Sequence, residues 1–265
     1  MKRLLWTALV AGLATHGLAE RKLAVLVGIS GYPIVKETQP FMAAENDLAK
    51  MRKLLGLQGF TTTELLESKA TGKSIRAALD QTAAQLKSGD QAVFYFTGCG
   101  SIAPNLAAPT DKANMEPTLA PYDASATTPD NDLRMGAIEK WAAKLTKAGA
   151  KATIIVDACF KPIFETRAFE FRRYNHVPRF IARKATSDGR ARETVYAGEG
   201  AYLGACPSTG AAYEWKEIGG ADNPWVSAFT SVLYSQARYA AMKRRSLSVE
   251  ELLRQVQAFF LPIFL

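Results

Sequence analysis

Two stretches, AVFYFTGCG (residues 92–100) and ATIIVDACF (residues 152–160), decide how this chain folds. Each begins as an apolar run rich in β-branched or aromatic residues and ends in a turn of small residues that carries a cysteine. Continuous apolar runs of this kind are typical of parallel strands that are buried on both faces. Parallel neighbours place their carboxyl ends on one edge of a sheet, where open α/β folds build their sites. We therefore expect Cys99 and Cys159 to face each other across one site.

Strand and helix patterns alternate along the rest of the chain, which predicts an α/β domain with a largely parallel sheet. Strands are expected at residues 23–29, 60–66, 91–97, 153–157 and 201–206, and helices at residues 43–57, 72–86 (capped by Thr71), 136–147, 225–241 and 248–260. Residues 102–132 form a long connection rich in Pro, Ala and Asp. Residues 161–197 carry nine basic and four acidic residues without a clear period, which predicts an exposed, mobile loop.

The first nineteen residues have the pattern of a secretory signal. They start with Lys2 and Arg3, continue with a mostly apolar stretch over residues 4–18 that is too short to span a bilayer, and end at Ala19, where cleavage is expected. An uncleaved anchor and a buried N-terminal helix are the alternatives. The pattern predicts an exported protein, periplasmic or secreted, with no membrane span after removal of the signal.

Composition excludes several other classes of protein. With 48% hydrophobic and 22% charged residues, the 265-residue chain is an ordinary globular protein. Removal of the signal leaves 31 basic and 25 acidic residues, a balance of +6. No basic motif interleaved with aromatic residues is present, so a solvated basic surface is favoured over nucleic-acid binding. One histidine, His176, would remain after cleavage, which excludes a multi-histidine metal site within one chain.

Several motifs, in the correct order, resemble those of the caspase and metacaspase superfamily, especially its bacterial members. FYFTGCGS (residues 94–101) is similar to the family's FYFSGHGS, which carries the catalytic histidine, and VDAC (residues 156–159) is similar to LDAC or LDSC, which ends in the nucleophile. AEND (residues 44–47), LGACPSTGAAYE (residues 203–214) and FTSVL (residues 229–233) also have counterparts in the family.

This resemblance implies a single caspase-like domain over residues 22–257, folded as a three-layer α/β sandwich with helices on both faces of the sheet. Its parts would be a large-subunit-like segment (22–160), the basic loop (161–197) and a small-subunit-like segment (198–257). Members of the family are cysteine endopeptidases with a Cys–His dyad. By resemblance, Cys159 is the nucleophile, and backbone N–H groups near Gly100 and Cys159 form an oxyanion hole.

The chain departs from the family at the histidine, because that position holds Cys99. A thiol is a poor proton acceptor at pH 7, and a thiolate at Cys99 would repel one at Cys159. Loss of a general base typically lowers the rate by about 10²–10⁴-fold. His176 could supply an imidazole only if its loop held it in a fixed geometry, so a surface histidine is the favoured interpretation. A Cys99–Cys159 disulfide would need Cα atoms within about 7 Å, and Cys206 is best explained as a small buried side chain.

The same resemblance places two aspartates, Asp47 and Asp157, in a pocket for a basic substrate side chain. A helix cap at Asp47 and a hydrogen-bonded strand end at Asp157 are the alternatives. Arg190 and Arg192, in the basic loop, are candidates for cleavage in trans.

The resemblance also provides candidate metal ligands, and no cofactor is expected. Asp123, Asp130 and Asp132 lie where some metacaspases bind calcium, although a solvated turn is favoured there.

Three functional hypotheses remain from the sequence. The first is a pseudoprotease that binds basic peptides or a partner protein. The second is a weakly active cysteine endopeptidase that cleaves after Arg or Lys. The third is a degenerate, truncated remnant, suggested by the helix over residues 248–260 and the abrupt end after it.

Overall fold

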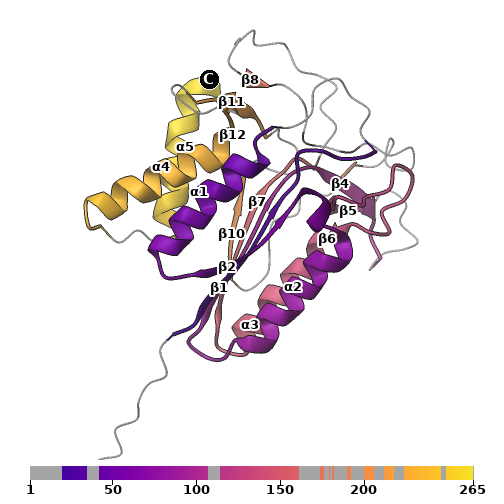
Figure 1. The fold of residues 1–265 in the computed structure, drawn as a ribbon, viewed down its shortest axis with the longest axis horizontal. Helices are drawn as coiled ribbons and strands as arrows, with labels where there is room; N and C mark the ends of the chain where they lie inside the picture. Colours follow the sequence, from indigo (N-terminus) through magenta and orange to yellow (C-terminus); the bar gives the residue numbers. More distant parts are fainter. Residues whose placement is uncertain are drawn as a thin grey trace, which may run out of the picture.

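Five parallel strands form the central sheet of the computed structural model, in the order β10-β7-β3-β1-β2 (Figure 1). The structure describes residues 20–34, 42–106, 114–160, 174–175, 179, 181, 190–191, 200–205, 212–217, 224–245 and 249–264. The strands are β1 (Lys22–Gly28), β2 (Thr61–Leu66), β3 (Gln91–Thr97), β7 (Lys151–Asp157) and β10 (Ala201–Gly204). The two cysteine-bearing stretches are therefore neighbouring strands, β3 and β7, as their sequences predict.

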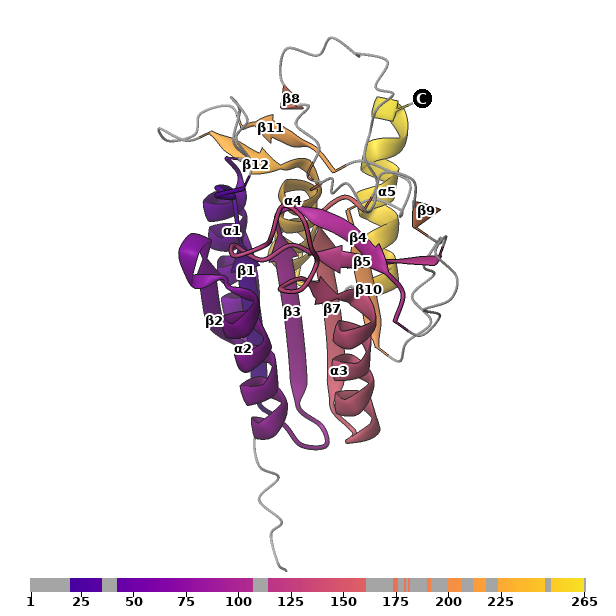
Figure 2. The same cartoon turned by 90° about the vertical axis from the view of Figure 1, so that its right-hand side faces the viewer.

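Helices cover both faces of this sheet and give the molecule three layers (Figures 1 and 2). One face is covered by α1 (Ala44–Leu57), α4 (Ala228–Met242) and α5 (Val249–Phe264), and the other by α2 (Gly72–Gln85) and α3 (Met135–Lys147). In β3, Phe94 and Phe96 belong to the core on the α2–α3 side, whereas Val93 and Tyr95 belong to the core on the α1–α4 side. This double burial explains why the strand is apolar at successive positions.

Two small antiparallel sheets lie beyond the carboxyl ends of the central strands (Figure 2). One contains β4 (Gly100–Pro104), β5 (Asn114–Leu119) and β6 (Leu133–Arg134), with β9 (Arg190–Ala191) added to β5 in parallel. The other contains β8 (Tyr174–Asn175), β11 (Glu214–Lys216) and β12 (Trp225–Ser227). A short 3-10 helix, η1 (Glu67–Lys69), precedes α2.

The predicted fold class is correct, and three local predictions need correction. The 102–132 connection contains regular structure, because β4 and β5 pair with each other over five residue pairs. The helix expected from Trp225 begins only at Ala228, after β12. The 161–197 loop is not exposed throughout, since Arg179 and Ile181 are buried. Each error has the same cause: pairing with a distant segment overrode the local pattern.

Other expectations concern residues that the structure does not describe. The signal-like segment at residues 1–19, His176, Arg192 and Cys206 lie outside the described residues. Within the described part of the chain, no helix has the length and apolar character needed to cross a membrane.

Candidate active site

The turns after β3 and β7 meet at the carboxyl edge of the sheet. Thr97 and Asp157 are register partners, and the N–H of Gly98 donates to the Asp157 carbonyl at 3.2 Å. The following cysteines, Cys99 and Cys159, are both buried thiols, with 1% and 0% of their surface exposed, and no disulfide joins them. The sheet therefore brings the two cysteine-bearing turns together, as their positions in the sequence predict.

Gly100 makes this close approach possible. A Cβ atom at this position would lie 2.0 Å from the carbonyl oxygen of Cys159, which is backbone and has little freedom to yield. Only glycine, which has no Cβ atom, fits at this position. The turn is also held by Tyr32, whose hydroxyl accepts the N–H of Cys99 at 2.8 Å and donates to the carbonyl of Ala120 at 3.1 Å.

Two backbone N–H groups at the candidate oxyanion hole converge on one carbonyl oxygen, and it belongs to Arg179. Gly100 donates to this oxygen at 2.8 Å and Cys159 at 3.2 Å. The sulfur of Cys159 accepts the N–H of Ala212 at 2.8 Å. A carbonyl oxygen held by two backbone N–H donors, one of them from a cysteine, matches the way an oxyanion hole holds a substrate carbonyl in acyl transfer.

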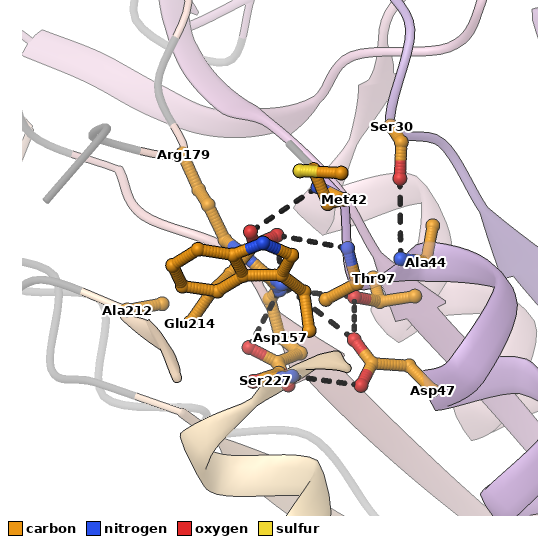
Figure 3. Close-up of polar contacts among 12 residues, drawn as sticks. Ser30, Met42, Ala44, Asp47, Thr97, Asp157, Arg179, Ala212, Glu214 and Ser227 are labelled. Atoms are coloured by element: carbon orange, nitrogen blue, oxygen red, sulfur yellow. Dashed lines mark hydrogen bonds and ion pairs between the residues drawn. The ribbon is translucent and has the colours of Figure 1, made fainter. Parts of the chain in front are cut away.

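The side chain of Arg179 enters a cluster of three buried carboxylates, which we call the acidic cluster: Asp47, Asp157 and Glu214 (Figure 3). Its guanidinium nitrogens lie 3.5 Å from Asp47, 3.0 Å from Asp157 and 2.9 Å from Glu214. The guanidinium also donates to the hydroxyl of Thr97 at 2.9 Å. Asp47 and Asp157 are the two aspartates for which the family resemblance predicts a pocket for a basic substrate side chain.

Neutral groups from several elements hold the aspartates of the acidic cluster in position. Asp47, on α1, accepts the Thr97 hydroxyl at 2.8 Å and the N–H of Ser227 at 2.9 Å. Asp157, at the end of β7, accepts the Thr230 hydroxyl at 2.7 Å. The bonds from Ser227 and Thr230 occupy the carboxylate oxygens opposite those that pair with the guanidinium, whereas the Thr97 hydroxyl shares Asp47 Oδ2 with it. The cluster is thus preorganised for a cation.

Glu214 is held in the same way at the start of β11. It accepts the backbone N–H groups of Met42 and Ala43 at 3.2 and 3.3 Å, just before α1 begins. The site thus joins segments that lie 171–172 positions apart in the sequence.

Charge in the acidic cluster is not balanced by Arg179 alone, since three carboxylates surround one guanidinium. Burial raises the pKa of Asp47 to about 7; the positive charge of Arg179 opposes this shift and Asp157 adds to it. Burial tends to lower the pKa of Arg179, but Asp157, Glu214 and Asp47 together raise that pKa well above its usual value. The guanidinium is therefore fully charged, and one carboxyl of the cluster gains or loses a proton near neutral pH.

Each of the three candidate calcium ligands accepts a hydrogen bond from a different neighbour. Asp123 accepts the N–H of Gly72 at 2.8 Å at the start of α2, Asp130 accepts the Thr128 hydroxyl at 2.7 Å, and Asp132 accepts the Thr118 hydroxyl at 2.6 Å. Among the residues described, no group of three or more metal-ligating side chains is suited to a metal ion.

Sequence reasoning did not single out two central residues of the site, Arg179 and Glu214. Arg179 is one of nine basic residues between positions 161 and 197, and the residues named there from the sequence are Arg190 and Arg192, as candidates for cleavage in trans. Glu214 is the last residue of the motif at residues 203–214, where no local pattern marks it as part of a site. Only their convergence in space distinguishes them.

These features define the class of protein: a caspase-like cysteine-peptidase fold with a cysteine after a central strand. Residues 21–260 match the model of the Caspase domain family, Peptidase_C14, and the chain belongs to this family.

Two metacaspases and two solved structures are similar to the chain. Metacaspase-7 and Metacaspase-4 of Arabidopsis thaliana are 29% and 31% identical to it over 147 residues, which is 52% of this chain and 34% and 33% of those proteins. The matched part thus spans about one third of the length of these relatives.

The structural matches are longer. Protein GSU0716 from Geobacter sulfurreducens has a TM-score of 0.63 at 17% identity, over 91% of this chain and 90% of that one. Caspase-1 from Spodoptera frugiperda has a TM-score of 0.53 at 16% identity, over 92% and 78%. At these identities the likeness concerns the fold.

Proposed function

We propose that this protein is a non-catalytic member of the caspase family that binds arginine-bearing peptides. The observation that carries the proposal is the placement of Arg179. Its side chain pairs with all three carboxylates of the acidic cluster, while its carbonyl accepts the N–H groups of Gly100 and Cys159. Charge-assisted bonds of this kind recognise a guanidinium specifically, and three of them in a buried site favour arginine over neutral side chains.

The proposal of weak or absent catalysis rests on the residue that follows β3. A dyad needs a group that takes the proton of the nucleophile and returns one to the leaving amine. Cys99 occupies that place in the sequence, and a thiol serves this purpose poorly. The nearby hydroxyl of Tyr32 is no substitute, because burial, and next the charge of Cys99, raise its pKa well above 10.

A second candidate function is slow cleavage after arginine, and the carbonyl of Arg179 favours it. Two N–H donors polarise that carbonyl as they would polarise a substrate in an active peptidase. In such a reaction, the Cys159 sulfur would add to the carbonyl carbon, and the C–N bond would break as the amine leaves with the proton that the thiol gave up. Water would then hydrolyse the thioester, which releases the carboxylic acid and restores the thiol. Without an imidazole at position 99, this reaction would be slower by about 10²–10⁴-fold than in a dyad enzyme.

Binding is tested first, with the Arg179→Ala variant, which empties the acidic cluster of its own cation. The probe is a fluorescent peptide amide with a single arginine, and the matched control peptide carries citrulline, which has the same shape without the charge. We expect binding of the arginine peptide alone, and loss of binding when Asp157→Asn is added. A folded Arg179→Ala variant that binds neither peptide would overturn the proposal.

Catalysis is then measured with a fluorogenic arginine substrate. We expect no turnover from Arg179→Ala and turnover after Cys99→His is added to it. Substantial turnover by Arg179→Ala that Cys159→Ala abolishes would favour the second candidate function. Export, proposed from the signal-like residues 1–19, is tested separately by the N-terminal sequence of the protein recovered from its native host.

A further inference from the structure

The segment that carries Arg179 continues along β4 as a strand would. The N–H of Gly100 donates to the carbonyl of Arg179 at 2.8 Å, and the carbonyl of Gly100 accepts the N–H of Ile181 at 2.9 Å. In parallel strands, the N–H and the carbonyl of one residue bond to two residues of the neighbouring strand that lie two positions apart, as Arg179 and Ile181 do here. The hydroxyl of Ser101 extends the pairing by donating to the carbonyl of Ile181 at 2.8 Å.

β4 is free to accept such a strand because it is the outer strand of its sheet. Within the described residues, the order of that sheet is β4-β5-β6, so β4 pairs with β5 on one side only. An outer strand offers a row of backbone donors and acceptors to any extended peptide. The carboxyl end of β3 leads directly into β4, so this row starts at the candidate active site.

The side chain of Ile181 is buried at this edge. It is 5% exposed and belongs to the hydrophobic core that also contains Cys99 and Phe160. An aliphatic side chain two positions after the arginine is thus enclosed, whereas a polar one there would lose its contacts with water. The Arg179 carbonyl, which accepts the N–H of Cys159, therefore lies between two recognised side chains along the segment: Arg179 in the acidic cluster and Ile181 in the core.

We infer that the site recognises an extended peptide with arginine in the acidic cluster and an aliphatic residue two positions later, paired in parallel with β4. The chain's own Arg179 and Ile181 are its internal ligand, and an external peptide competes with them. This inference rests on the proposed function and adds to it a second specificity position, on the carboxyl side of the arginine.

The test compares two peptides on one protein, the full chain with Arg179→Ala. The first, acetyl-Val-Pro-Arg-Phe-Ile-Ala-Arg-amide, copies residues 177–183, and the second has serine in place of its isoleucine. Burial of an isoleucine corresponds to roughly tenfold to hundredfold in affinity, so the first peptide should bind tighter by that factor. The native chain should bind this peptide at least about tenfold more weakly than Arg179→Ala, because its own segment occupies the site.

Equal binding of the two peptides would overturn the aliphatic position and leave the proposed function intact. Equal binding by the native chain and Arg179→Ala would overturn the internal ligand. Absence of binding by either peptide would instead count against the proposed function, so the failures are distinguishable.

A second measurement does not depend on removing Arg179. In the native chain, trypsin should cut slowly after this buried arginine. Ile181→Ser should accelerate that cut by about tenfold or more, whereas Leu57→Ser, at a side chain that is 68% exposed, should not change it. An unchanged rate in Ile181→Ser would overturn the role of Ile181.

Discussion

Replacing Arg179 by alanine should lower the free energy of unfolding by about 3–5 kcal/mol, the usual cost of removing one partner from a buried ion pair. The side chain is 2% exposed and pairs with three carboxylates at 2.9–3.5 Å. At an effective dielectric constant of about 20, each such pair attracts by ~5 kcal/mol. Desolvation of the four charges offsets most of that sum, so the cost is set by the charges left behind in the variant.

The loss should depend on pH, since the acidic cluster can take up protons. Burial raises the pKa of Asp47, and the positive charge of Arg179 opposes that rise, so removal of the guanidinium should raise the pKa of Asp47 further in the folded variant. A raised pKa in the folded state supports stability at low pH, and that support is lost as pH rises. The difference between the native chain and Arg179→Ala should therefore be larger at pH 8.5 than at pH 5.5.

Urea unfolding followed by circular dichroism measures this difference at both pH values. For a chain of this size, 3–5 kcal/mol corresponds to a fall in Tm of roughly 6–20 °C. The matched control is Arg52→Ala, which removes an arginine that is 57% exposed and pairs with Glu64 at 3.1 Å. That change should cost about 0–1 kcal/mol. If Arg179→Ala costs no more than Arg52→Ala, Arg179 does not occupy the acidic cluster.

Two further predictions concern the same site. The pKa of Asp47 is about 7 in the folded state against 3.8 in the unfolded state, so Asp47 binds more protons when the chain is folded, and the free energy of unfolding should fall by up to ~4 kcal/mol between about pH 4 and 7. Asp47→Asn should flatten this pH dependence in urea titrations, and an unchanged slope would contradict the prediction. Gly100→Ala should destabilise the fold by about 1–3 kcal/mol, because the added Cβ atom would clash with the Cys159 carbonyl. The control Gly56→Ala, in open space on α1, should stabilise the fold by ~0.5–1 kcal/mol. Equal Tm shifts in the two variants would refute the close approach of Gly100 to the Cys159 carbonyl.

Local patterns in the sequence predicted most of the main sheet and its helices. The strand at residues 91–97 agrees with β3 at both ends, and Thr71 caps α2 by accepting the N–H of Ser74 at 3.1 Å. These elements follow from apolar runs, helical spacing and cap chemistry, all of which operate between residues near one another in the chain. The short strands β8, β9 and β12 have two or three residues each, and such strands exist only through their partners.

By itself, the sequence determined the family, the strand ends that carry Cys99 and Cys159, and the substitution of the expected histidine. The reason is that an apolar run ending in a small-residue turn places its last residues at a sheet edge whatever surrounds it. The occupant of the acidic cluster, in contrast, depends on how distant segments pack in three dimensions. Arg179 reaches carboxylates that are 132, 22 and 35 positions away in the chain, and no local pattern encodes that meeting. The pairing of buried charges depends on their distance in space and not on their distance along the chain. The proposed internal ligand, Arg179, could therefore be identified only from the folded structure.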